Sequence, residues 1–281
     1  MIISSNSASL EIYRAYSQNL SKQSTALMQI SSGVKINSAK DDPNTIAQSE
    51  RFRMQIRGLQ MAGRNTQDGV SMLQTAEGGL DGMTSSLQRA RELIVQAGGI
   101  TTDSDKKDIQ AEINQTLNAV DDMANNTEFN GVKLLSDGAN NGSVKIAMVI
   151  GANVGEKIDI PKYNLTTQGL NLKGVDGVVK VDVNSVDASL ELVDNALKNI
   201  VAARSKYGAL ENRFESTYNS TMAISEKVES ADSSIRDTDL AGQMIEFSKD
   251  NVLIQAGNAM MAQSNKLPQD ALTILENIRS R

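Results

Sequence analysis

Acidic side chains come closest to forming a chemical site in this 281-residue sequence. Neighbouring carboxylates can hold a divalent cation or share acid–base work. The candidates are Asp41, Asp42, Asp103, Asp105, Asp108, Asp121, Asp122, Asp237 and Asp239. Near the start of a helix, Asp more often caps backbone N–H groups or interacts with the helix dipole. We therefore predict capping and dipole roles for these carboxylates, with no metal or catalytic site.

The composition removes most other chemistry, because the chain has no His and no Cys. An imidazole base, a His-based triad and a His-Glu-x-x-His metalloprotease insert are excluded, as are thiolate nucleophiles and disulfides. The Gly78-Gly79 and Gly98-Gly99 pairs lack the spacing of a phosphate-binding loop. We expect neither enzymatic activity nor a cofactor.

Charge and hydropathy limit the partners. Lys and Arg number 28 against 34 Asp and Glu, a formal net charge of -6. This balance disfavours non-specific binding to nucleic acid or to an anionic membrane. No run of 18 apolar residues could span a bilayer, and the N-terminus lacks the basic and apolar regions of a secretory signal.

Two long segments carry core-type side chains at seven-residue spacing, which is typical of a coiled coil. Aromatic residues make up only 3% of the chain, so narrow aliphatic stripes between helices must supply the core. The first segment begins at Asp42-Pro43, and the second begins after Ser185. The repeat positions are Leu59, Thr66, Leu73, Leu80, Leu87 and Ile94, then Val193, Ile200, Tyr207, Phe214, Thr221, Val228 and Ile235.

The two ends of the chain carry thinner apolar stripes on polar helices, and Pro268 interrupts the second. Such stripes are too narrow to stabilise a free pair of helices, so we expect them to become ordered only among neighbouring chains. The predicted subunit-packing residues are Leu10, Tyr13, Leu20, Leu27, Leu240, Met244, Phe247, Ile254 and Met261.

The middle of the chain changes to a period of two, which predicts a β-hairpin over 144–160. A third helix is expected over 104–125. The fold class is therefore mainly α: a long antiparallel bundle built from both halves of the chain, with a small β region in the middle. The expected domains are 1–40 with 238–281 and 41–162 with 183–237. Residues 163–182 are expected to form a short, exposed loop with no separate outer domain.

Several sequence motifs in this order resemble those of bacterial flagellin, the filament subunit of the flagellum. The resemblance covers about residues 1–160 and 185–275. Two departures are a longer C-terminal end after Leu275 and a short middle. The motifs are residues 34–43 (VKINSAKDDP), 67–80 (QDGVSMLQTAEGGL), 87–93 (LQRAREL), 128–135 (EFNGVKLL), 235–241 (IRDTDLA) and 262–269 (AQSNKLPQ).

The resemblance implies a secreted structural protein that polymerises with itself into an extracellular helical filament for motility. It implies export through the flagellar type III apparatus without a cleavable signal. An export chaperone, the export gate, and the hook-associated and cap proteins are the implied partners. Terminal helices would form the inner tube and the heptad helices the outer tube. A hook–filament junction protein, which shares the terminal helices, is the alternative.

Two surface sites are also implied by the resemblance. In many flagellins a vertebrate Toll-like receptor binds the long helices, and the matching positions are Arg89, Leu93 and Glu112. Taken without the resemblance, these are ordinary helix charges and a residue flanking the seam. Some flagellins carry O-linked glycans, for which Thr166 and Thr167 are the candidates.

Overall fold

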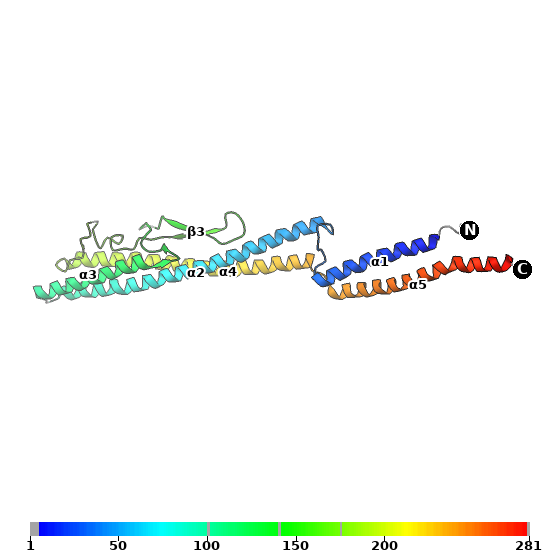
Figure 1. Ribbon diagram of the computed structural model, residues 1–281. Coiled ribbons are helices and arrows are strands. Elements are labelled where there is room, and N and C mark those ends of the chain that lie inside the picture. Colours follow the sequence, from blue (N-terminus) through cyan, green and yellow to red (C-terminus); the bar gives the residue numbers. More distant parts are fainter. Residues whose placement is uncertain (1–5, 100–101, 140–141, 175, 280–281) are drawn as a thin grey trace. The chain divides into compact units, whose positions relative to one another are not determined.

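The protein is described by a computed structural model covering residues 6–99, 102–139, 142–174 and 176–279 (Figure 1). Its contacts divide into two compact units, which we call the terminal unit (Met1–Met54 with Val228–Arg281) and the central unit (Gln55–Lys227). The helices are α1 (Ser7–Ser32), α2 (Pro43–Ala97), α3 (Asp103–Asn126), α4 (Val186–Arg236) and α5 (Leu240–Arg279). The strands are β1 (Glu128–Phe129), β2 (Val132–Lys133), β3 (Lys145–Val149) and β4 (Lys157–Pro161).

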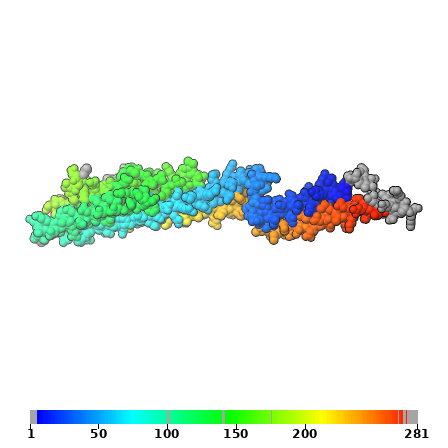
Figure 2. Space-filling view, viewed as in Figure 1, coloured from blue at the N-terminus to red at the C-terminus, as the bar shows by residue number. Residues whose placement is uncertain are grey.

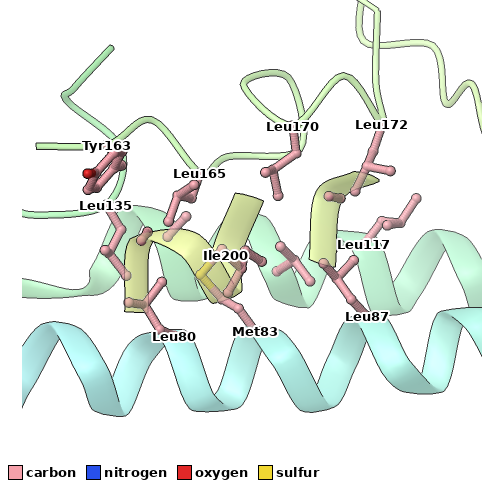
Figure 3. Packing of buried hydrophobic residues seen from close by; sticks show 14 of the residues in the cluster. Leu80, Met83, Leu87, Leu117, Leu135, Tyr163, Leu165, Leu170, Leu172 and Ile200 are labelled. Carbon is pink, nitrogen blue, oxygen red and sulfur yellow. The ribbon is translucent and has the colours of Figure 1, made fainter. Parts of the chain in front are cut away.

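The predicted heptad positions form the core of the central unit. Leu80 and Leu87 of α2 and Ile200 and Phe214 of α4 are all fully buried. Aliphatic side chains of α3 complete the same cluster, in which Leu117 lies between the two longer helices (Figure 3). The long-helix prediction is therefore confirmed, and α2 continues without a break through its six glycines.

Helices α2 and α4 run antiparallel. Arg91 of α2 pairs with Asp194, and further back along α2 Glu77 pairs with Arg204. The ion-pair partners on α4 thus lie later in the sequence as the residues on α2 lie earlier, which is the pattern of antiparallel helices. Helix α3 folds back on α2 in the same sense, because Arg89 pairs with Glu112 near one end.

Glycine allows the helices of this bundle to approach closely. A Cβ atom on Gly69 would lie 2.7 Å from Met148 Sδ and 3.0 Å from the Phe214 ring. A Cβ on Gly79 would lie 2.5 Å from Thr127 Oγ1. A side chain at either position would force its neighbours to shift, so packing favours glycine here.

Two antiparallel hairpins follow α3. The predicted hairpin is confirmed as β3 paired with β4, from Lys145 opposite Pro161 to Val149 opposite Lys157. The sequence reading missed the short β1–β2 pair, which turns at Asn130 and Gly131, both at positive φ. An Asn-Gly dipeptide is the usual signal for this turn and was interpreted only as a loop.

The segment 163–182 is not the exposed loop that the sequence predicts. Tyr163, Leu165, Leu170 and Leu172 are buried and cover the bundle (Figure 3). The buried apolar side chains of this segment pack in the same cluster as those of α3 and α4, whose aliphatic face the helices leave open. Covering that face removes apolar area from water, which stabilises an irregular segment despite its lack of strands.

In the terminal unit α1 lies along α5 (Figures 1 and 2). Helix α1 ends at Gly33 in the left-handed conformation, with φ of 73°. The following residues pair with the end of α4, because Lys35 N donates to Arg236 O at 2.7 Å. Arg236 also contacts Ser49 and Glu50 of α2. The unit boundaries therefore fall within α2 and α4, whereas the domain limits near residues 40 and 238 stay a prediction.

Pro268 does not interrupt α5, contrary to the sequence prediction. Proline has no N–H group, so the carbonyl oxygen of Ser264, four residues earlier, loses its usual helical donor. The side chain of Asn6 supplies a replacement, since its Nδ2 donates to that oxygen at 2.9 Å. The same Asn6 caps α1 by accepting from Ser9 N. One amide thus satisfies both helices where they meet.

Truncating a seam side chain should cost much more stability than truncating an exposed one on the same helix. We expect Leu87→Ala to lower the free energy of unfolding by about 2–5 kcal/mol, because it leaves a cavity in a fully buried cluster. Val95→Ala, at a position 54% exposed, should change it by less than about 0.5 kcal/mol. Urea unfolding of the monomer measures both, and equal losses would contradict the assignment of the seam.

Candidate subunit-packing surface

Helices α1 and α5 meet through a seam that mixes polar and apolar side chains. The side of α1 facing α5 carries half-buried Ser9, Ile12, Tyr16, Asn19, Gln23 and Ile30, and Ala26 is its one buried residue among those described. Gly257 of α5 faces Tyr16, with 3.6 Å between that ring and a built Cβ. A half-buried seam of this composition removes less apolar surface from water than the fully buried core of the central unit does, and it contributes less to stability.

The predicted apolar stripe of α1 lies outside this seam. Leu10, Tyr13, Leu20 and Leu27 are 52%, 58%, 47% and 54% exposed. They lie at neighbouring turns along one side of the helix, as their three- and seven-residue spacing requires. A contiguous exposed apolar stripe on a helix usually marks an interaction surface.

The predicted residues of α5 divide into two groups. Leu240 and Met244 are exposed, like the stripe of α1. Phe247, Ile254 and Met261 are half-buried instead and lie on the side of α5 that carries Gly257, facing α1. These three therefore contact α1 within the chain, and their remaining exposure leaves part of each side chain available.

Further exposed apolar residues on α5 were missed by the sequence reading. They lie one or two residues from the predicted positions, so that the apolar surface of α5 is broader than one heptad stripe. Counting the apolar residues on every side of this helix, rather than along one seven-residue repeat, would have found them. They are Ile245, Val252, Leu253 and Met260, at 69%, 64%, 40% and 53% exposure.

The carboxylates near helix starts act as caps, as predicted. Asp42 Oδ1 accepts from the backbone of Asn44 and Thr45 at the start of α2, which lowers its pKa together with the Thr45 hydroxyl. Asp105 forms a capping box with Thr102 at α3. Across the described ranges, no three acidic residues come together in a way that could hold a metal ion.

Asp121 has a different role, since it anchors the segment 163–182. Its oxygens accept from Thr167 N at 2.7 Å, Thr167 Oγ1 at 2.6 Å and Lys173 Nζ at 2.9 Å. Burial raises the pKa of Asp121, but the hydrogen bonds from Thr167 and Lys173 outweigh it, so the pKa lies below its ordinary value. The charged form therefore stabilises the fold.

This hydrogen-bond network reduces the accessibility of the two candidate glycosylation sites. Thr167 is fully buried and its hydroxyl is engaged by Asp121, so it is not accessible to a modifying enzyme in the folded chain. Thr166 is half-buried, and its hydroxyl donates to Asn164 Oδ1 at 2.7 Å. The expectation of an exposed loop was wrong because the apolar residues around these threonines pack against the bundle and bury much of the segment.

The residues proposed for receptor contact differ in exposure, since two of them are exposed and one is buried. Arg89 and Glu112 form an exposed ion pair at 2.7 Å between α2 and α3, and Glu112 raises the pKa of Arg89. Leu93 is 1% exposed and packs in the core cluster. The side chain of Leu93 therefore cannot contact a partner in this conformation, while Arg89 and Glu112 can.

Over the described residues, no helix is both long and apolar enough to cross a bilayer. The long antiparallel helices and small strand pairs are those of a mainly helical structural protein. The chain belongs to the bacterial flagellin family. Residues 3–140 match the bacterial flagellin N-terminal helical region, and residues 190–275 match the C-terminal helical region.

Full-length relatives agree with this membership. A flagellin of Bacillus subtilis is 39% identical over 98% of this chain and 100% of its own length. A flagellar filament 31.3 kDa core protein of Treponema maltophilum is 35% identical over the same shares. The structure of a putative flagellar hook-associated protein from Vibrio parahaemolyticus has a TM-score of 0.58 at 17% identity, over 70% of this chain and 100% of that one. That last likeness concerns the fold alone.

Stability should fall at low pH, and Asp121 should contribute to the loss. A carboxylate whose pKa is lowered on folding adds stability above its ordinary pKa of 3.8, and that stability disappears as the pH falls through the folded value. We expect Asp121→Asn to cost about 1–3 kcal/mol at pH 7 and to flatten the decline below about pH 4.

Asp122→Asn is the matched control, because Asp122 is exposed and adjacent to Asp121. Urea unfolding of the monomer from pH 7 to pH 3 measures both variants. An Asp121→Asn curve parallel to that of the wild type at all pH values would contradict the role of the charged form.

Proposed function

We propose that this chain is the structural subunit of a bacterial flagellar filament, and that its terminal helices complete their folding only in the polymer. The observation that carries the proposal is the exposed apolar stripe of α1, from Leu10 to Leu27, beside a seam with α5 that is only half-buried. Full-length relatives named as flagellins and filament core proteins support the same function.

The energetics favour ordering by neighbours. Burying the exposed half of each stripe residue would contribute on the order of 1 kcal/mol. Each residue of α1 and α5 that becomes fixed loses a comparable amount of conformational free energy. The isolated hairpin therefore gains little by ordering, whereas contacts with several neighbouring subunits add the missing burial. Polymerisation and folding of the ends are then one process.

The two units have different tasks in this proposal. The terminal helices, within residues 1–40 and 238–281, form the inner tube of the filament. The bundle of 41–162 with 183–237 forms the outer tube. Residues 163–182 cap the bundle and carry no further outer domain. The chain acts as a structural protein with no enzymatic activity.

Membership of the family also supports a set of partners and a location. The filament lies outside the cell, and the subunit reaches it through the flagellar export apparatus, handled by an export chaperone and the export gate. Hook-associated and cap proteins contact the two ends of the polymer. We propose no cofactor for the chain, and neither nucleic acid nor a membrane as its partner.

A hook–filament junction protein is the alternative, supported by the fold-level likeness to the Vibrio protein. The two functions differ in their behaviour at high concentration. A filament subunit seeded with filament fragments elongates into long helical fibres, which negative-stain microscopy detects. Monomer that covers the fragment ends without elongating them would support the junction function and overturn our proposal.

Polar substitutions in the exposed stripe should block elongation without unfolding the central unit. We expect the double variant Leu20→Gln, Leu27→Gln to raise the concentration needed for polymerisation by about tenfold or more, because burial of both side chains is lost. Val201→Gln, at a position 53% exposed on α4, is the control and should polymerise normally. Wild-type elongation by the double variant would contradict the packing role of the stripe.

We also propose that Arg89 and Glu112 contribute to recognition by a vertebrate Toll-like receptor. Their exposure and mutual ion pair support this, whereas Leu93 acts from the core by fixing the helix that carries Arg89. Arg89→Ala should weaken a receptor reporter response by about fivefold or more. Arg91→Ala, which removes the ion pair with Asp194, is the control. An equal response from wild type and Arg89→Ala would exclude Arg89 from the contact.

A further inference from the structure

A second site lies in the central unit, away from the ion pair of Arg89 and Glu112. It is a cavity of about 500 Å³ between the β3–β4 hairpin and one side of α4. Lys145 and Asp159 line it from the hairpin, and Lys206 and Arg213 line it from α4. The last two are seven residues apart, so they lie on the same side of the helix.

The charge of this cavity is opposite to that of the chain. It has three cations and one carboxylate among its lining residues, whereas the whole chain has a net charge of -6. Lys145 Nζ lies 3.9 Å from Asp159 Oδ2. In the part of the chain that the structure describes, neither Lys206 nor Arg213 forms an ion pair. Two cationic groups therefore face the cavity without a compensating charge.

Tyr163 provides an independent indication of a ligand. Its ring lines the cavity and is 5% exposed, yet its hydroxyl oxygen is buried without a hydrogen-bond partner among the described residues. Tyr207, 5.6 Å away between ring centroids, instead donates its hydroxyl hydrogen to Pro161 O at 2.9 Å. A buried hydroxyl is normally satisfied, so the Tyr163 hydroxyl at the wall of the cavity has an unused hydrogen-bonding capacity.

The surrounding groups fit an acceptor rather than a donor. Lys206 Nζ lies 5.7 Å from the centroid of the Tyr163 ring, which places its ammonium beside that side chain. Ammonium, guanidinium and phenol groups all donate hydrogen bonds, and an oxyanion has both the lone pairs to accept from all three and the charge that two cations favour. Gly142 keeps the wall open, since a Cβ there would lie 3.1 Å from the Tyr163 hydroxyl oxygen.

We propose that this cavity binds an oxyanion, a carboxylate or a phosphate group, through Lys206, Arg213 and the hydroxyl of Tyr163. The group belongs either to a small solute or to an acidic side chain of a second copy of the chain. This site is separate from the terminal stripe, and only the second source, a neighbouring copy of the chain, rests on the proposed polymerisation.

The first test titrates the full-length monomer with inorganic phosphate, and separately with citrate, at constant ionic strength. Amide shifts in ¹H–¹⁵N spectra should saturate with a dissociation constant of about 1 mM or tighter, and should cluster at residues 142–145, 159–163 and 206–213. The double variant Lys206→Gln, Arg213→Gln should bind at least about tenfold more weakly, because two charge-assisted hydrogen bonds are lost. Tyr163→Phe should weaken binding without changing the charge.

Lys198→Gln is the matched control, because Lys198 is an exposed cation of α4 that does not line the cavity. It should bind as the wild type does. Shifts that rise linearly without saturation, or equal affinity in the wild type and the double variant, would overturn the site. Circular dichroism melting confirms that the variants are folded, and Tyr163→Phe provides the second test if the double variant is not.

The second test distinguishes the two sources of the oxyanion. If a carboxylate of a neighbouring copy fills the cavity, assembled filaments should bind phosphate much more weakly than the monomer does. Saturating phosphate should then also slow the seeded elongation of the wild type, but not that of the double variant. If the ligand is a small solute, filaments and monomer should bind phosphate equally and elongation should not change. Absence of phosphate binding in the monomer together with unchanged elongation of the double variant overturns both.

Discussion

Burial of the aliphatic seam shared by α2, α3 and α4 is the interaction on which the central unit depends. Side chains such as Leu87, Leu117 and Ile200 lose all contact with water there. Because aromatic residues are scarce, the seam is long and narrow, and it needs antiparallel helices of great length to accumulate enough buried area. The hairpins and the segment 163–182 then cover the face that the helices leave open.

The terminal unit has the same helical architecture without the same burial. Its intrachain seam mixes Ser, Asn and Gln with half-buried apolar side chains such as Ile12 and Phe247, while the leucines of the α1 stripe remain outside. Specific polar contacts, such as the amide of Asn6 on the carbonyl of Ser264, set the register of the two helices but remove little apolar area from water. A pair of helices whose register is fixed but whose apolar surface stays exposed is suited to a part that becomes stable only among other copies.

Two regions of the central unit differ in whether their buried polar groups are hydrogen-bonded. Asp121 satisfies the backbone and hydroxyl of Thr167 and the ammonium of Lys173, so that region is closed and structural. The hydroxyl of Tyr163 has no such partner and faces a cationic cavity. The difference between a satisfied and an unsatisfied buried group separates an anchor from a candidate binding site.

The sequence by itself determined the helices, the heptad seam, the β3–β4 hairpin and the family, because spacing, capping residues and extended motifs are local properties of the chain. It did not determine which side of α1 faces α5, that Leu93 and Thr167 are buried, or that Tyr163, Lys206 and Arg213 line one cavity. These depend on packing between segments distant along the chain. Only the tertiary structure decides which of several exposed or apolar faces is covered, because burial is shared among all the segments that compete for it.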